Sequence, residues 1–419
     1  MKTKAVRLYG KSDLRLEEFE LPEIGEDEIL ARVVSDSICM SSYKAAIQGN
    51  EHKRVPNDID KNPVIIGHEF CGDILEVGKK WQGQFSPGDK FSIQPALNYK
   101  GSLDAPGYSF RYIGGSSQYI VIPSVVMEQG CLLKYDGEAF FYGSLAEPMS
   151  CIVGAFNANY HTESGSYVHK MGIKQGGRMA ILAGVGPMGM GSIDFAINGP
   201  VNPKLLVVTD IDQARIDRAA KIFSPEMAAS KGVKLIYLNT ANIDAVAELM
   251  ALTDGNGYDD VLVMAPVKAV VEQADRILGR DGCLNFFAGP TNPEFRAEFN
   301  FYNVHYASTH VVGTSGGNTD DMIQSLELMS AGKIDPSIMI THIGGLNAAI
   351  ETTLNLPRIP GGKKLIYNHI ELELTAIADF REKGKTDPLF AALADIVEKN
   401  NGLWSTEAEK YLLANAKKI

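Results

Sequence analysis

"LAGVGPMGMG", residues 182–191, is the stretch that decides the fold of the second half of the chain. It places Gly184, Gly186 and Gly189 in the pattern GxGxxG, after an apolar run that predicts a strand and at the start of a predicted helix. Asp210 follows about twenty residues later, at the end of the next predicted strand. In this context the pattern predicts a dinucleotide-binding turn. The alternative is a glycine-rich turn in which the aspartate only caps a helix.

Each part of this turn has a physical role in holding a dinucleotide. The first glycine permits the tight turn, the second lets the backbone approach a pyrophosphate, and the third lets helix and strand pack closely. Pro187 and Met188 lie within the turn, and the helix N-terminus offers N–H groups to the phosphates. The Asp210 carboxylate can accept hydrogen bonds from ribose hydroxyls and would repel a 2′-phosphate. NAD(H) is therefore predicted over NADP(H), although Arg215 in the next helix could weaken that preference.

Strands and helices alternate around this turn over residues 159–308. Their spacing predicts a parallel, doubly wound sheet. The predicted strands are "RMAILAG" (178–184), "LLVVTD" (205–210), "KLIYL" (234–238), "YDDVLVMA" (258–265) and "GCLNFFAG" (282–289), with helices over 212–223, 242–252 and 267–278 between them.

The N-terminal part, residues 1–158, has a different pattern of apolar and polar residues. Short alternating or β-branched runs are separated by Gly, Pro, Asn and Asp, which indicates a rolled, barrel-like sheet. After the parallel sheet, residues 309–368 predict a helix, a short strand and another helix. Residues 369–419 are charged and helix-prone. The fold class is therefore α/β, with a β-barrel domain interrupted by a doubly wound domain.

Charge and cysteine content restrict the partners and the compartment. The net charge is −11 and the pI about 5.3, which argues against nucleic acid or an anionic membrane as the main partner. The five cysteines are odd in number and form no CxxC pair, as expected of a reduced intracellular protein. No N-terminal signal is apparent, and apolar runs fall short of the roughly 20 residues of a membrane span. The sequence predicts a cytoplasmic protein.

A second motif, "NPVIIGHEFCGDILEVG" at residues 62–78, places His68 and Glu69 side by side in an apolar run. Neighbouring residues of a strand point to opposite faces, so both can serve one site only if the backbone bends at Gly67. Cys39 precedes a predicted short helix, and Glu147 lies in "SLAEPMSC". A thiolate, an imidazole and a carboxylate form a typical zinc set. Taken singly, each of these side chains is as readily explained by packing, hydrogen bonding or a helix start.

These motifs resemble those of the medium-chain zinc-dependent dehydrogenases, the alcohol and polyol dehydrogenases. "GHEFCGDILEVG" is similar to the family signature around the metal ligands, and Cys39, "LAEP" and "LAGVGPMG" occur in the family's order. The resemblance spans residues 1 to about 367. It implies a GroES-like catalytic domain (1–158 and 309–368), interrupted by a Rossmann domain (159–308) and followed by a helical extension (369–419). Hydride would pass between a nicotinamide and a substrate carbon beside zinc.

The resemblance also implies roles for individual residues. One catalytic zinc per subunit would be held by Cys39, His68 and either Glu69 or Glu147, and Ser41 would relay the proton of the reacting hydroxyl. The family often has a histidine five residues after the ligand cysteine, where this chain has Lys44. Residues 90–117 contain no cysteine, so no structural zinc is expected.

The C-terminal extension, "CMSSYK" (39–44) and "NFFAGPTNPEFRAEFNFYNVHYASTHVVGTSGG" (285–317) resemble those of the L-sorbose-1-phosphate reductase branch. This resemblance implies reduction of L-sorbose 1-phosphate to glucitol 6-phosphate. A phosphate needs cations near the site, and Lys44, Lys53, Arg54 and Arg111 are candidates; the loop cations could equally be solvated surface charges. One alternative is a dehydrogenase of free polyols or of an amino alcohol. Another is a metal-free quinone reductase or nicotinamide-binding protein. In the resembled family, edge strands of the Rossmann domain pair between subunits, so a homodimer or homotetramer is expected, with residues 298–313 as the edge.

Overall fold

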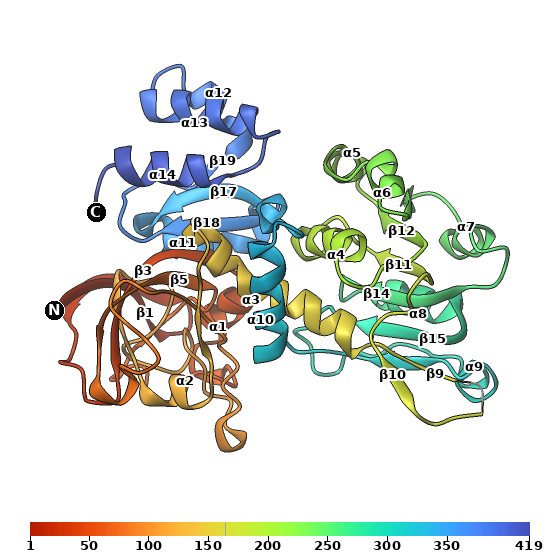
Figure 1. The fold of residues 1–419 in the computed structure, drawn as a ribbon, viewed down its shortest axis with the longest axis horizontal. Coiled ribbons are helices and arrows are strands. Elements are labelled where there is room, and N and C mark those ends of the chain that lie inside the picture. The colour runs from red at the N-terminus through yellow and green to blue at the C-terminus, as the bar shows by residue number, and fades with distance from the viewer. Residues whose placement is uncertain (164) are drawn as a thin grey trace. The chain divides into compact units, whose positions relative to one another are not determined.

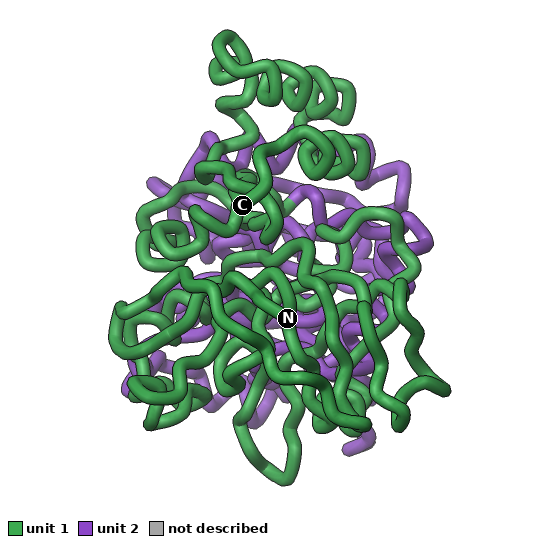
Figure 2. Tube along the Cα trace, turned by 90° about the vertical axis from the view of Figure 1, so that its left-hand side faces the viewer, with its two compact units in different colours: residues 1–147, 339–419 green, residues 148–338 purple. Residues whose placement is uncertain are grey.

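The computed structural model describes residues 1–163 and 165–419, and the chain divides into two units (Figure 1). One unit contains residues 1–147 and 339–419, and the other contains residues 148–338 (Figure 2). Among the described residues, none of the helices combines the length and the apolar character needed to cross a bilayer.

This division differs from the boundaries predicted at residues 158 and 308. One continuous helix, α3 (Phe140–Ala158), begins in the first unit and ends in the second. Past residue 308, β16 (His310–Val312) adds a parallel strand to the sheet of the second unit. The following helix, α10 (Thr319–Ser330), also stays there, because Asn157 of α3 donates a 2.9 Å hydrogen bond to Asp321. The chain therefore returns to the first unit only at residue 339.

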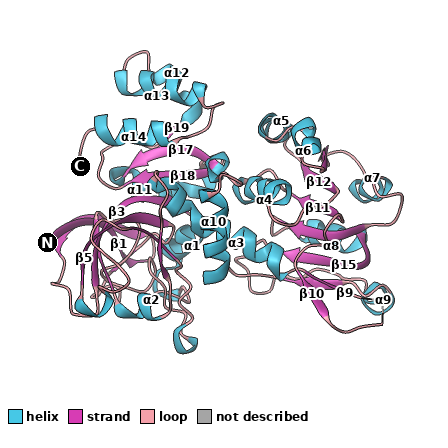
Figure 3. Cartoon of the chain, viewed as in Figure 1, coloured by secondary structure: helices cyan, strands magenta, loops and turns pink. Residues whose placement is uncertain are grey.

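The second unit contains the predicted doubly wound sheet. Its six strands pair in the order β13-β12-β11-β14-β15-β16 and all are parallel. The strands of this unit are β9 (Tyr160–Thr162), β10 (His169–Met171), β11 (Arg178–Leu182), β12 (Leu205–Asp210), β13 (Lys234–Asn239), β14 (Tyr258–Val263), β15 (Leu278–Phe286) and β16. Its helices are α4 (Pro187–Asn198), α5 (Gln213–Ile222), α6 (Pro225–Ser230), α7 (Ala245–Ala251), α8 (Lys268–Ile277), α9 (Phe301–Tyr306) and α10 (Figure 3). β11 and β14 are buried almost throughout, which explains their continuous apolar sequences.

The first unit contains the predicted β-rich domain. Its main sheet has the order β19-β17-β18-β3-β5-β6-β8, with β7 paired to β3, and a smaller sheet has the order β2-β1-β4. The strands are β1 (Lys2–Gly10), β2 (Asp13–Glu20), β3 (Ile29–Ile38), β4 (Val64–Ile65), β5 (Phe70–Val77), β6 (Lys90–Ile93), β7 (Tyr119–Ile122), β8 (Leu132–Lys134), β17 (Ile340–Gly345), β18 (Lys363–Tyr367) and β19 (Thr375–Ala376).

The helices of the first unit include those of the C-terminal segment. Besides the start of α3 they are α1 (Met40–Gln48), α2 (Ser124–Glu128), α11 (Ala349–Asn355), α12 (Phe380–Lys383), α13 (Pro388–Lys399) and α14 (Thr406–Asn415). The chain also has short 3₁₀ turns at Gly49–Glu51, Lys79–Trp81, Tyr99–Gly101, Pro336–Met339, Leu346–Ala348, Leu356–Arg358 and Ile377–Asp379.

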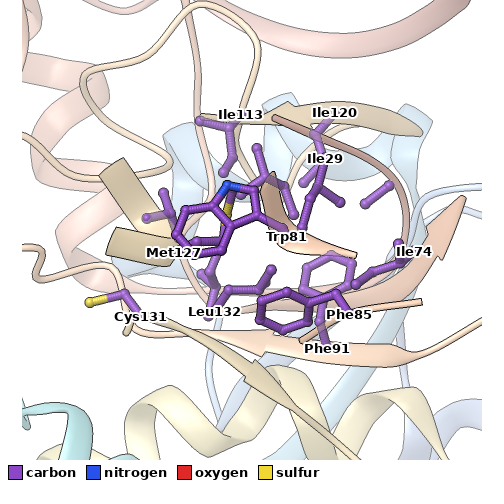
Figure 4. Close-up of a cluster of buried hydrophobic side chains, with 14 of the residues drawn as sticks. Ile29, Ile74, Trp81, Phe85, Phe91, Ile113, Ile120, Met127, Cys131 and Leu132 are labelled. Carbon is purple, nitrogen blue, oxygen red and sulfur yellow. The ribbon is translucent and has the colours of Figure 1, made fainter. Parts of the chain in front are cut away.

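An aromatic and aliphatic cluster fills the β-domain. Trp81, Phe85 and Phe91 pack with Ile29 and Ile74 from neighbouring strands (Figure 4). The Trp81 indole donates a 2.8 Å hydrogen bond to the carbonyl of Asp27, so its polar edge is satisfied at the margin of the core. This cluster fixes β3 and β5, the strands next to Cys39 and His68.

Candidate active site

A glycine bend brings the adjacent histidine and glutamate to one site. Gly67 lies between β4 and β5 with φ +93°, and a Cβ there would meet a carboxylate oxygen of Asp36 at 2.3 Å. Only glycine suits both the conformation and the space. After this bend, ligand atoms of Cys39, His68 and Glu69 all lie within 4.8 Å of one another.

Hydroxyl groups of α1 orient the imidazole. Cys39 is the N-cap residue of this helix, and Ser41 and Ser42 lie in its first turn. The Ser42 hydroxyl is 3.1 Å from Nδ1 of His68. The Ser41 hydroxyl lies 3.1 Å from the Cys39 sulfur and 3.2 Å from Nε2 of His68. Burial lowers the pKa of His68, so the ring is neutral at pH 7. With Nδ1 held by Ser42, its Nε2 lies next to the hydroxyls of Ser41 and Tyr108.

Glu69 makes a buried ion pair that the sequence analysis did not identify. Both of its carboxylate oxygens accept hydrogen bonds from Nζ of Lys363, at 2.5 and 2.7 Å. The two residues are 0% and 5% exposed. Burial alone would raise the pKa of Glu69, but the charge of Lys363, the interaction with His68 and the hydrogen bonds from Lys363 together outweigh it, and the net direction is downward. Lys363 is the first residue of β18 and lies 294 residues after Glu69 in the sequence. The sequence feature that could have pointed to it is the pair of lysines at the start of an otherwise apolar strand, "KKLIY".

Glu147, the other candidate carboxylate, projects from α3 into the same charge cluster. Burial raises its pKa to about 7, with His68 opposing this and the charges of Glu69 and Cys39 adding to it. The four predicted metal residues therefore interact electrostatically within the first unit. The two carboxylates differ in their charge partners, because the charge of Glu69 is balanced by its ion pair with Lys363.

The donor set fits a zinc ion. A thiol, an imidazole with its second nitrogen held by a hydroxyl, and the Glu69 carboxylate lie with their ligand atoms within 4.8 Å of one another, and these are groups that form catalytic zinc sites. Burial, with the charge of Glu69, raises the pKa of the Cys39 thiol. A bound divalent cation would reverse that effect by stabilising the thiolate.

Aromatic rings and cations lie beside the imidazole. The Tyr108 hydroxyl is 3.3 Å from Nε2 of His68, and the Tyr108 ring stacks on His52 with centroids 5.7 Å apart. The Arg54 guanidinium is 5.7 Å from the same ring. Burial and then the charges of Arg54, Lys53 and Lys44 lower the pKa of His52 to about 4.

Three of the four predicted cations, Lys44, Lys53 and Arg54, therefore act electrostatically on His52. The fourth, Arg111, is exposed and packs over Tyr112 at 5.5 Å. The sequence analysis identified neither His52 nor Tyr108, because each lies in a polar loop without a recognisable motif.

The second unit contains the predicted dinucleotide turn. A Cβ on Gly189 would lie 2.0 Å from the carbonyl oxygen of Gly184, so the third glycine is required for helix–strand contact. Gly186 is the N-cap of α4; a Cβ there would meet only the Arg215 guanidinium, at 4.0 Å, and no side chain of the described residues caps the helix. The turn thus leaves its face open for a pyrophosphate.

Asp210 ends β12 as predicted. One of its carboxylate oxygens accepts hydrogen bonds from the backbone N–H groups of Ile211 and Asp212, at 2.9 and 3.1 Å. These bonds fix the carboxylate at the carboxyl edge of the parallel sheet, where dinucleotides bind. The residues of the turn fit a dinucleotide.

Comparison with known proteins defines the class. Residues 25–129 match the family described as alcohol dehydrogenase GroES-like domain, and residues 205–331 match the family described as zinc-binding dehydrogenase. The chain belongs to the medium-chain zinc dehydrogenase family and is a nicotinamide-dependent zinc dehydrogenase. The predicted fold class is confirmed: a GroES-like domain with a six-stranded parallel Rossmann sheet.

Three relatives align over nearly their whole length. The protein named "Uncharacterized protein YggP", from Escherichia coli (strain K12), is 56% identical over 99% of this chain and 97% of its own. A mannitol-1-phosphate 5-dehydrogenase of Aliivibrio fischeri (strain ATCC 700601 / ES114) is 54% identical over 98% and 97%. An L-sorbose 1-phosphate reductase of Klebsiella pneumoniae is 51% identical over 100% and 98%.

Proposed function

We propose that this protein is a dehydrogenase of sugar or polyol phosphates that reduces L-sorbose 1-phosphate to glucitol 6-phosphate with NADH. The observation that carries a phosphorylated substrate is the position of Arg54 over the ring of Tyr108, which stacks on His52 and contacts His68; the charges of Lys53 and Lys44 also act on His52. A phosphate dianion is recognised by such cations. Two relatives act on six-carbon phosphates by name.

The chemistry follows from the residues around Cys39. Zinc bound by Cys39, His68 and the carboxylate of Glu69 or Glu147 would polarise the substrate oxygen as a Lewis acid. The Ser41 hydroxyl, within 3.2 Å of both Cys39 and His68, is positioned to hydrogen-bond that oxygen and to relay its proton. Lys44 follows Ser41 by three residues on α1, so the two side chains are neighbours on the helix surface.

Mannitol 1-phosphate is the second candidate substrate, favoured by the 54% identical relative. The two reactions differ in geometry. In L-sorbose 1-phosphate the carbonyl carbon adjoins the carbon that bears the phosphate. The name of the mannitol-1-phosphate 5-dehydrogenase places the reacting carbon at the opposite end of the sugar. Initial rates with both phosphates, in both directions, separate these possibilities.

The test of a phosphate contact compares phosphorylated and free sugar. We expect Arg54→Ala and Lys44→Ala each to lower kcat/KM for L-sorbose 1-phosphate about 10- to 100-fold, the loss of one charge-assisted hydrogen bond. Their kcat/KM for L-sorbose should change far less. Arg111→Ala, which removes an exposed cation outside the group around His52, is the matched control. Equal losses with both sugars would remove the substituted residue as a phosphate contact.

We further infer that the protein associates through the edge of its Rossmann sheet. β16 is the edge strand, and α9 precedes it. This edge exposes large apolar side chains: Phe301 is 76%, Tyr302 68%, Tyr306 61% and Val311 50% exposed. Unpaired strand edges and grouped aromatic side chains favour pairing with a second chain.

A further inference from the structure

The C-terminal segment contributes a buried carboxylate to the first unit. Glu409 in α14 is 2% exposed. Its carboxylate accepts hydrogen bonds from the backbone N–H groups of Phe140 and Phe141, at 2.6 and 2.9 Å. These are the first two residues of α3, so a side chain 269 residues away along the chain caps the helix N-terminus. A carboxylate at this end also interacts favourably with the helix dipole.

The Glu409 carboxylate is also hydrogen-bonded to the main sheet of the first unit. The Tyr367 hydroxyl donates to Glu409 at 2.8 Å, and the buried Trp404 indole donates to that hydroxyl, also at 2.8 Å. Tyr367 is the last residue of β18. Glu409 therefore joins the end of one strand to the start of one helix, through three hydrogen bonds to its two oxygens.

Both connected elements carry metal-site residues. Glu147 lies seven residues into α3, about 10 Å along the axis from Phe140. Lys363, which holds Glu69, lies four residues before Tyr367, about 13 Å along β18. A shift of the start of α3 relative to β18 would therefore change the distance between Glu147 and the Glu69–Lys363 pair.

We propose that Glu409 is a positioning residue through which the C-terminal segment sets the geometry of the zinc site. The inference rests on the proposed zinc site and assigns to residues 369–419 a role in metal binding. The Glu409 carboxylate does not touch the candidate ligands. It fixes the positions of α3 and β18, and these two elements carry Glu147 and Lys363.

The test is Glu409→Gln in the full chain. Glutamine keeps one acceptor oxygen but places an NH₂ group against backbone N–H donors, so at least one cap bond is lost. We expect the zinc dissociation constant, measured by chelator competition, to rise severalfold, below the about 10- to 100-fold effect of removing a partner that bonds a ligand directly, because Glu409 acts through α3 and β18. The kcat should fall while KM for the nicotinamide, which binds the second unit, stays unchanged.

Two further variants make the test discriminating. Glu407→Gln, on the exposed face of the same helix, should match the parent. Tyr367→Phe keeps the helix cap but removes the hydrogen bond between Glu409 and β18. It should weaken zinc binding by a smaller factor than Glu409→Gln. If Glu409→Gln fails to fold, the zinc affinity of Tyr367→Phe provides the test. Parental zinc affinity and kcat in both folded variants, with only a lower Tm, would overturn the inference. A parent that binds no zinc would instead refute the proposed function.

Discussion

The buried pair of Lys363 and Glu69 offers the sharpest test of the site. The perturbation is Lys363→Met, which keeps the length of the side chain and removes its charge. In metal-free protein this leaves the Glu69 carboxylate fully buried with its counter-charge gone. Breaking a buried pair from one side costs about 3–5 kcal/mol. We expect the free energy of unfolding of the metal-free protein to fall by that amount at pH 7.

An independent estimate comes from the protonation of Glu69. With Lys363 removed, burial raises the pKa of this carboxyl above its ordinary value of 4.5. If the group stays neutral in the folded variant, holding the proton at pH 7 costs about 3.4 kcal/mol, at about 1.36 kcal/mol per pH unit above 4.5. The two estimates agree, and the second also predicts a pH dependence.

The sign of that dependence is opposite in parent and variant. In the parent the folded pKa of Glu69 is lowered, so the pair stabilises the fold above about pH 4.5 and this is lost as pH falls through the folded pKa. In the variant the folded pKa is raised, so stability falls as pH rises above 4.5. The gap between the two proteins should therefore widen as the pH rises from 4.5 to 7, and should close only below the folded pKa of Glu69 in the parent. Cys39, His68 and Glu147 also face Glu69, but they are common to both proteins.

The assay is urea unfolding of chelator-treated protein at several pH values. The matched control is the double variant Lys363→Met, Glu69→Gln, which removes both charges and should recover most of the lost stability. Saturating zinc should also restore part of it, because a ligand that binds only the folded state stabilises that state. A single variant as stable as the parent at pH 7, or a double variant no better than the single, would refute the reasoning.

Two further predictions concern the second unit. Asp210→Ser should raise the ratio of kcat/KM for NADPH to that for NADH about 10- to 100-fold, because it removes the charge that repels a 2′-phosphate; a parent that already prefers NADPH would contradict the assignment of NAD(H). Replacing Tyr302 and Tyr306, both more than 60% exposed, by aspartate should shift the protein to a smaller species in light scattering. An unchanged mass would exclude this edge as the interface, and Tyr167→Asp, at an exposed tyrosine outside the edge, is the control.

Much of the fold could be predicted because its signals are local. The turn at Gly184–Gly189 joins a strand and a helix that are adjacent in sequence, and alternation along the chain indicates the parallel sheet. The second unit of the structure continues past the predicted boundary at residue 308, to residue 338. β16 is only three residues long and half exposed, so no hydrophobic periodicity marks it. α10 belongs with the second unit through a contact with Asn157, which lies far back in the sequence.

The site was predictable only for residues within motifs. Cys39, His68, Glu69 and Glu147 stand next to glycines, a proline or a helix start. The ligand atoms of the first three lie within 4.8 Å of one another, and Glu147 interacts with them electrostatically. Lys363, Tyr108 and Glu409 act through partners at long sequence separation, which spacing cannot reveal. Of the predicted phosphate ligands, Arg54 lies beside Tyr108 while Arg111 does not, and nothing in the two loops distinguishes the two arginines.

The charges of the site explain why a lysine lies beside two candidate ligands. A thiolate and two carboxylates carry three negative charges, and a zinc ion supplies only two positive ones. A buried site with that excess would bind a proton. In the metal-free protein, burial first and then the charges of Glu69 and Cys39 raise the pKa of Glu147 to about 7. Lys363 supplies the missing charge. Because it engages both oxygens of Glu69, it favours the ionised form of that carboxylate. If Glu69 bound the metal, it would have to share or give up its bonds to Lys363. The ion pair therefore makes the two carboxylates chemically different as candidate ligands, and zinc affinity measured in Glu69→Gln and in Glu147→Gln would separate them.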